Sequence, residues 1–162
     1  MTASIPFWVP ALFLGLVFLG YRQSQPRRVK PGALVAIALA MLGLSLYGVV
    51  SAFGAQPVAL LLWAFGYGIA VMLGAKYFAS RGLVAEGNLV RIPGSWVPLV
   101  LFLAIFVAKF VLGFAAGVHS PLLQHIGFVA VMSGVLGFLS GGFGARAWAV
   151  HHCANAANVA SV

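Results

Sequence analysis

Five apolar stretches occupy most of this chain, and almost every charged residue lies between them or after them. They cover residues 5–21, 34–53, 58–75, 97–116 and 122–143. Most approach the ~20 residues that cross a bilayer core as a helix, and the first is shorter. Barrel strands would alternate apolar and polar residues, whereas these stretches are apolar throughout. The pattern predicts an all-α membrane protein, a five-span helix bundle in one domain (residues 1–150) with a short cytoplasmic tail (151–162).

The composition agrees with this class of protein. Of 162 residues, 63% are hydrophobic and 6% are charged, whereas a soluble domain carries about 25% charged residues. The net charge of +8 is spread over segments that flank the spans and forms no soluble basic domain. We therefore predict a lipid bilayer as the surroundings and no nucleic-acid partner. Cys153 is the only cysteine, so no intrachain disulfide can form.

The distribution of Lys and Arg predicts the orientation. Basic residues follow the first, third and fifth stretches, and none lies in the segments after the second and fourth. By the positive-inside rule, the N-terminus is outside and the C-terminus inside. The tryptophans occupy positions expected at the two membrane interfaces, which agrees with this orientation. Trp8 and Trp63 lie towards the outer side, and Trp96 and Trp148 lie towards the inner side.

Two pairs of short segments resemble each other. The sequence IPFWVP at 5–10 is similar to IPGSWVP at 92–98, and SAFGA at 51–55 is similar to GGFGA at 141–145. The first two spans would then match the last two in opposite orientation, as in the inverted repeats of transporters. Coincidence within apolar sequence of low complexity is the alternative, and both interpretations stay open.

Lys109 is the one charged residue inside a predicted span. The chain has no Asp, and its single Glu lies in a predicted loop. A charge at the bilayer centre costs about 2.5–3.5 kcal/mol on insertion scales, so such residues usually face a cavity or a partner. One interpretation is a binding or proton-carrying lysine, with Tyr47, Tyr67 and Ser133 as candidate polar neighbours. The other is that its long stem lifts the amine to the outer headgroups.

A face of small residues runs along the fifth span. Its members recur every four residues and are Ser133, Gly137, Gly141 and Ala145. Such a face lets another helix backbone approach closely. We favour packing within the monomer, and a homo-oligomer seam is the alternative.

The histidines form two groups. His119 and His125 flank the outer end of the fifth span, six positions apart, so they do not form an i, i+4 metal pair. We interpret them as interfacial residues and keep them as weak candidates for metal or haem ligands. His151, His152 and Cys153 lie in a tail that we expect to be solvated and loosely ordered.

Motifs that carry enzymatic chemistry are absent from the sequence. It contains no phosphate-binding loop, nucleophile elbow, zinc-ligand spacing or carboxylate pair. We therefore assign no catalytic residue, metal site or cofactor, and we favour a function other than catalysis.

The opening IPFWVPALFLGLVFLGYRQS and the Arg- and Pro-rich segment after it resemble a group of small bacterial inner-membrane proteins classed as a domain of unknown function. The resemblance implies a multi-pass protein of the bacterial inner membrane, and it implies no activity.

Three hypotheses for the function remain. The first is a carrier or channel for an anion or weak acid that uses Lys109, because an excess of cationic groups suits an anion path. The second is an accessory subunit that docks into a larger membrane complex, which needs no polar site. The third is a haem or quinone protein that uses His119 and His125, and it ranks last because the chain offers few ligands.

Overall fold

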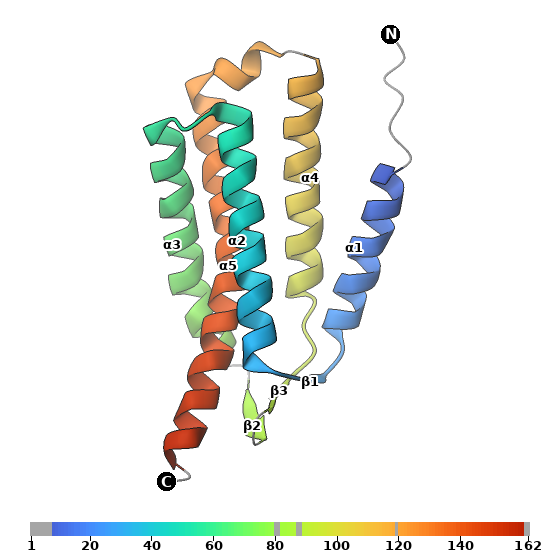
Figure 1. Cartoon of the computed structure of the whole chain (residues 1–162), viewed down its shortest axis with the longest axis vertical. Coiled ribbons are helices and arrows are strands. Elements are labelled where there is room, and N and C mark those ends of the chain that lie inside the picture. Colours follow the sequence, from blue (N-terminus) through green and yellow to red (C-terminus); the bar gives the residue numbers. More distant parts are fainter. Residues whose placement is uncertain (1–7, 80–81, 87–88, 119, 161–162) are drawn as a thin grey trace.

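The α-helices α1 to α5 run alternately up and down the molecule (Figure 1). The structure is a computed structural model that describes residues 8–79, 82–86, 89–118 and 120–160. The helices are α1 (Trp8–Ser24), α2 (Pro31–Phe53), α3 (Pro57–Ala79), α4 (Val97–Gly117) and α5 (Ile126–Ala160). The α2–α3 turn and a short 3-10 turn, η1 (Pro121–Gln124), lie at one end of the bundle, and three short strands lie at the other.

The helices have the length and composition of membrane spans. Within the described residues, four are long and apolar enough to cross a bilayer: Pro31–Phe53, Pro57–Phe78, Val97–Gly117 and Ile126–Ala156. Helix α1 is apolar but has 17 residues, which makes it roughly 25 Å long. The predicted class, an all-α membrane protein, is confirmed. The crossing of α1 as a fifth span and the orientation of the bundle stay predictions.

The last helix differs most from its predicted bounds. It begins at Ile126 because residues 121–124 form η1, and it continues to Ala160 through the segment that we expected to be loosely ordered. Alanine has the highest helix propensity, and four of residues 154–160 are alanine. Asn155 Nδ2 and His151 Nε2 also lie 3.3 Å apart, one turn from each other. The expectation of a loosely ordered tail was therefore wrong for the described residues.

A three-stranded antiparallel sheet closes one end of the bundle, and the sequence analysis did not predict it. Its strands are β1 (Arg27–Val29), β2 (Val84–Glu86) and β3 (Leu89–Ile92), in the order β1-β3-β2. Two of the strands lie in the segment around Glu86, the chain's single Glu, which we interpreted as a loop. Val90 and Ile92 are buried at 1% and 5% exposure, and they alternate with the exposed Arg91 as a half-buried strand requires.

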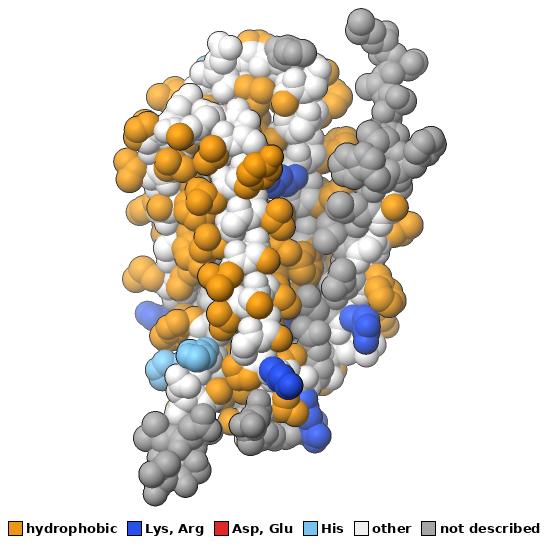
Figure 2. Space-filling view, in the orientation of Figure 1, with side chains coloured by type: hydrophobic (Ala, Val, Ile, Leu, Met, Phe, Trp, Pro, Cys, Tyr) orange, Lys and Arg blue, Asp and Glu red, His pale blue; other side chains and the backbone are white. Residues whose placement is uncertain are grey.

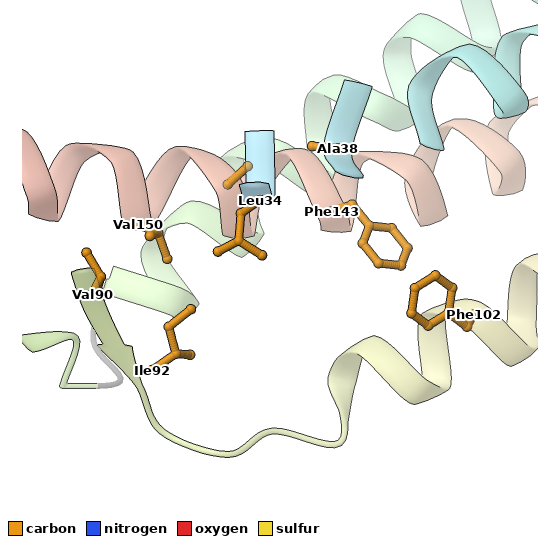
Figure 3. Close-up of a cluster of buried hydrophobic side chains, with 8 residues drawn as sticks. Leu34, Ala38, Val90, Ile92, Phe102, Phe143 and Val150 are labelled. Carbon is orange, nitrogen blue, oxygen red and sulfur yellow. The ribbon is translucent and has the colours of Figure 1, made fainter. Parts of the chain in front are cut away.

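Among the described residues, buried apolar side chains form three clusters, and the two larger ones fill the bundle. The core beside the sheet is formed by Leu34, Ala38, Val90, Ile92, Phe102, Phe143, Ala147 and Val150. Figure 3 shows Val90 and Ile92 on the strand beside Val150 of α5, and Phe102 of α4 facing Phe143 of α5, with ring centroids 4.9 Å apart. The second core, towards η1, is formed by Val49, Phe53, Ala59, Ala108, Leu112, Val129 and Leu136.

The helices differ in how closely they approach. Helices α3 and α5 pack most extensively, with Gly66 against the backbone of Gly134 and Gly137 against the backbone of Trp63. Helix α1 packs on α4, where the rings of Phe13 and Phe106 lie 5.3 Å apart. Helices α2 and α4 touch far less. Their line of contact is called the α2/α4 seam below, and that of the first pair the α3/α5 seam.

The contacts between helices do not test the suggested internal repeat. Each helix contacts its suggested counterpart, because α1 lies against α4 and α2 against α5. However, Phe53 is the last residue of α2, whereas Phe143 lies in the middle of α5. The two matched segments thus occupy different places in their helices, and the duplication stays a prediction.

Candidate functional site

Lys109 lies across the α2/α4 seam. Its Nζ donates a hydrogen bond to the backbone carbonyl of Leu44 at 3.1 Å. One turn further along α2 is Gly48, where an added Cβ would collide with Lys109 Nζ. The missing side chain at Gly48 therefore provides the space that the amine occupies. Leu44 and Lys109 stand about equally far along α2 and α4, so the amine reaches sideways to a neighbouring helix.

The position of the positive charges is visible on the surface. Figure 2 shows Lys and Arg gathered near the sheet end of the bundle and, apart from them, a blue patch part-way up between α2 and α4. Acidic side chains do not balance this charge within the spans, because the chain has no Asp and its single acid, Glu86, belongs to β2 at the sheet end. A small anion entering the seam would therefore meet a cation with no carboxylate competitor from this chain's helices.

The three polar residues expected near Lys109 are not its hydrogen-bond partners. Tyr47 is 71% exposed on the outer surface of α2. Tyr67 stacks on Trp63 of its own helix, with ring centroids 5.8 Å apart. Ser133 is fully buried in α5, and its hydroxyl has no hydrogen-bond partner within the described part of the chain. Within the described part of the chain, no hydrogen bond joins any of the three to Lys109, and their role in a site with Lys109 stays a prediction.

A buried polar link joins three helices beside the seam. The indole N–H of Trp63 in α3 donates to the hydroxyl of Ser45 in α2 at 2.9 Å, and that hydroxyl donates to the carbonyl of Leu136 in α5 at 2.9 Å. The hydroxyl of Ser140 donates to the same carbonyl at 3.0 Å. This link was not predicted from the sequence, since Trp63 was interpreted as an interfacial residue. The available signal was Ser45, a hydroxyl within an otherwise apolar run from Leu34 to Leu46.

The face of small residues on α5 is occupied within the monomer. Gly137 lies against the backbone of Trp63, and a Cβ at Gly141 would stand 2.6 Å from the carbonyl oxygen of Tyr67. Ser133 and Ala145 on the same face are both fully buried. This face therefore packs against α3 and is not free to form a seam with a second copy.

Arg146 is a buried cation just beyond the predicted end of the fifth span at residue 143. It is 5% exposed and lines a cavity of about 10 Å³ between α5 and the sheet, room for a single water. Ile92, Ser95 and Phe78 are among the other residues that line this cavity. The small residues on either side, Ala145 and Ala147, were the signal that the helix continues into packed surroundings.

The histidines do not come together as a ligand set. His119 lies outside the described residues, and His125 is exposed just before α5. His151 and His152 are exposed on the last turns of α5, where the ring of His152 lies 5.2 Å from that of Trp148. Over the described ranges, no three His, Cys, Asp or Glu residues are grouped closely enough to hold a metal ion.

These observations define a small all-α membrane protein with a lysine at the seam between two helices. The chain belongs to a family of unknown function, DUF6622, whose model matches residues 1–160. The predicted membership of an uncharacterised family is thereby confirmed. Comparison with curated proteins and with solved structures gives no significant match.

Proposed function

We propose that this protein binds a small anion or weak acid at the α2/α4 seam and carries it across the bacterial inner membrane. The observation that carries the proposal is the position of Lys109, whose amine reaches α2 in the apolar part of the bundle. Intramembrane cations usually mark a substrate path or have a partner. Here no acidic side chain of the membrane helices can serve as that partner.

The hydrogen bonding of the amine leaves capacity for a ligand. An ammonium group has three N–H donors, and within the described part of the chain Lys109 has one acceptor, the carbonyl of Leu44. That carbonyl belongs to a helix and is already within reach of the N–H of Gly48, one turn on. An incoming carboxylate or inorganic anion would be a stronger acceptor, since hydrogen bonds between ionised groups are about twice as strong as neutral ones.

Helices α2 and α4 can also separate at their seam with a modest cost in free energy. Helix α4 is held mainly by α1 and α5, and it touches α2 over a short length. Lys109 crosses that contact with a flexible side chain. Separation of α2 and α4 would therefore break fewer contacts than separation of α3 and α5, which suits a path for a small solute.

The experiment is a flux assay with purified protein in liposomes, using chloride, acetate and phosphate as probe anions. Lys109→Met removes the charge and should abolish uptake while the protein still folds. Lys109→Arg should not restore it, because guanidinium does not deprotonate and has a different donor geometry. Wild-type uptake by Lys109→Met for every transported anion would refute the proposal.

A matched pair of glycine variants tests the seam with the charge left intact. Gly48→Ala should displace the amine of Lys109 and lower uptake, since the new methyl group occupies the same space. Gly43→Ala on the same helix meets no atom within 4 Å and should transport like the wild type. Equal uptake by the two variants would show that transport does not depend on the position of the Lys109 amine.

A second candidate function is that of an accessory subunit of a larger membrane complex. It is supported by an apolar groove of about 370 Å³ on the outer side of the α3/α5 seam, lined by Phe65, Gly66, Gly134 and Phe138 among others. A helix of a partner protein would fit such a groove. Ala130→Trp, which fills the groove, should release a co-purifying partner, whereas Ala40→Trp on the exposed surface of α2 should not.

The orientation is part of the proposal and has its own test. With Cys153 replaced by Ser, a membrane-impermeant thiol reagent applied from outside should label Gln56→Cys and spare Gln25→Cys. Both glutamines are exposed at opposite ends of the bundle. The reverse labelling pattern would show that the sheet end faces outwards.

A further inference from the structure

The hydrogen bond between Lys109 and Leu44 lies on the surface of the bundle. The bond is exposed, and Figure 2 shows the blue patch between α2 and α4 at the surface of the molecule. Lys109 supplies this patch, because it is the only Lys or Arg of these two helices. The outer surface of membrane-spanning helices faces lipid, so the amine is within reach of a molecule that approaches sideways through the bilayer.

The amine also lies deep in the apolar layer. Helix α4 has 21 residues, which makes it about 31 Å long and matches the roughly 30 Å of the hydrocarbon core. Lys109 is two residues past Val107, the middle residue of α4. Leu44 on α2 and Val107 and Phe110 on α4 are 56%, 56% and 45% exposed. A ligand at the amine is therefore surrounded by hydrocarbon on its lipid side.

A row of polar atoms on α2 leads from the amine towards the η1 end of the bundle. Lys109 Nζ bonds to the carbonyl of Leu44 and lies against Gly48, one turn on. The hydroxyl of Ser51, about a turn further, donates to the carbonyl of Gly48 at 3.2 Å. Ser51 is itself exposed. These groups offer polar contacts to a ligand over two turns of helix, about 11 Å.

Helix α4 leaves room beside this row. Gly113 lies one turn beyond Lys109 in the same direction and about 40° around the helix from it. It is exposed, and an added Cβ there would meet no atom within 4 Å. A head group can therefore lie between the η1 end and the amine without displacing a side chain at this position.

These surroundings favour an acid with a hydrocarbon chain. A hydrated inorganic anion would have to give up its water to reach this depth, which is costly in free energy. A long-chain acid is already concentrated in the bilayer, since each methylene group raises its partition about fourfold. Its carboxylate needs a cationic partner, which Lys109 supplies, and its chain can stay among the lipids beside Leu44 and Phe110.

We propose that the weak acid bound at Lys109 is a long-chain carboxylate, which enters the α2/α4 seam sideways from the leaflet on the η1 side. Its head group passes Ser51 and pairs with the amine, while its acyl chain stays in the lipid. The hydroxyl of Ser51 can rotate from the carbonyl of Gly48 to the carboxylate, because a hydroxyl hydrogen turns to suit its acceptor. This choice of substrate class rests on the proposed function of Lys109.

The experiment is photo-crosslinking of the full-length protein in phosphatidylcholine liposomes. The probe is a palmitic acid that carries a diazirine near its carboxyl group and a terminal alkyne. Crosslinks located by mass spectrometry should concentrate on α2 and α4 beside Lys109. Unlabelled palmitate should compete, whereas methyl palmitate, which has the same chain and no charge, should not. Labelling spread evenly over the helices, or equal competition by methyl palmitate, would overturn the proposal.

Variants at the two polar groups locate the site. Lys109→Met should lower labelling of the seam at least tenfold, as expected for the loss of a hydrogen bond to a charged group. Ser51→Ala should lower it several-fold. The matched control is Ser24→Ala, since the hydroxyl of Ser24 donates in the same way to a carbonyl three residues back, on α1 at the sheet end. Wild-type labelling by Lys109→Met or by Ser51→Ala would contradict the site.

A pair of leucine variants keeps the amine and tests the space beside it. Gly113→Leu fills that space and should lower labelling about tenfold with an unchanged circular dichroism spectrum. Gly68→Leu on α3, where an added Cβ also meets no atom within 4 Å, should be labelled like the wild type. Equal labelling of the two variants would rule out the proposed path.

Acetate separates this inference from the proposed function. It has the same head group without a chain, so it should compete with the probe only at a concentration more than about 1000-fold above that of palmitate. Uptake of acetate that depends on Lys109, without labelling of the seam by the probe, would leave the proposed function standing and refute the long-chain ligand. Labelling of the seam together with wild-type uptake by Lys109→Met would refute transport and support the long-chain site.

Discussion

The α3/α5 seam and the α2/α4 seam both depend on glycine, with opposite consequences. In the α3/α5 seam, Gly66 and Gly137 face the backbone of the neighbouring helix. In the α2/α4 seam, Gly48 faces the far end of a lysine side chain. A backbone can yield only if a whole helix moves, whereas a lysine side chain rotates about several bonds. The same residue type therefore builds a fixed contact in one place and an adjustable one in the other.

This difference indicates that helix α4 and the group formed by α2, α3 and α5 have different roles in the bundle. Helices α2, α3 and α5 are joined by close backbone packing and by the hydrogen bonds of Ser45 and Trp63. Between membrane helices such packing and hydrogen bonding replace the hydrophobic effect, since lipid is as apolar as the side chains. Helix α4 lacks a hydrogen bond of this kind other than that of Lys109, within the described residues. We infer that the first group is the scaffold and that α4 is the element able to shift.

The largest effect is expected from Gly137→Ala. Its new methyl group would meet the backbone of Trp63, so α3 and α5 must separate, at a cost of about 1–3 kcal/mol typical of overpacking. The control is Gly68→Ala on α3, where a Cβ meets nothing within 4 Å. Thermal unfolding in detergent, followed by tryptophan fluorescence, measures both. Equal stability of the two variants would remove the distinction between the seams.

A smaller effect is expected from the polar link. Ser45→Ala leaves the indole N–H of Trp63 and the carbonyl of Leu136 without this hydroxyl. Hydrogen bonds between membrane helices contribute about 0.6 kcal/mol on average and up to about 1.7 kcal/mol. A double-mutant cycle with Trp63→Phe isolates the interaction and should give a coupling energy of that size. A coupling energy of zero would mean that packing alone holds α2 to α3.

The smallest effect on stability is expected from Gly48→Ala. The lysine amine can swing aside, so the variant should unfold within about 0.5 kcal/mol of Gly43→Ala, the range of ordinary surface substitutions. In a Lys109→Met background the two alanine variants should become indistinguishable. A loss as large as that of Gly137→Ala would show that the α2/α4 seam is as rigid as the α3/α5 seam, and the mobile role of α4 would be abandoned.

Sequence analysis predicted the helices well where an apolar run ends at a turn or a charge. The bounds of α2 and α4 differ from prediction by three residues or fewer. The predictions failed for segments that pair or pack with residues distant in the sequence. Strand β1 pairs with β3 across more than sixty residues, and short strands give little periodic signal by themselves. Just past residue 143, Ala145, Arg146 and Ala147 of α5 are buried against the rest of the molecule, and their burial follows from distant partners.

The candidate site was predicted in part. Lys109 was found because a charge in an apolar run is costly wherever the helix points. Its partners were not found, because helix rotation decides which faces meet. Ser133 and Tyr67 share its approximate depth yet lie in another interface, and Leu44 and Gly48 have no polar side chain that could have marked them.

The sequence alone determined the pattern of hydrophobicity and charge, because each residue carries these properties independently of its neighbours. They specify a membrane helix bundle, a cation within it and a basic end. The tertiary structure decided how the helix faces meet, which glycine stands against backbone and which against Lys109. It also placed Arg28 beside Arg91. The physical reason is that apolar helices have no strongly preferred face in lipid, so close packing and a few hydrogen bonds select the arrangement.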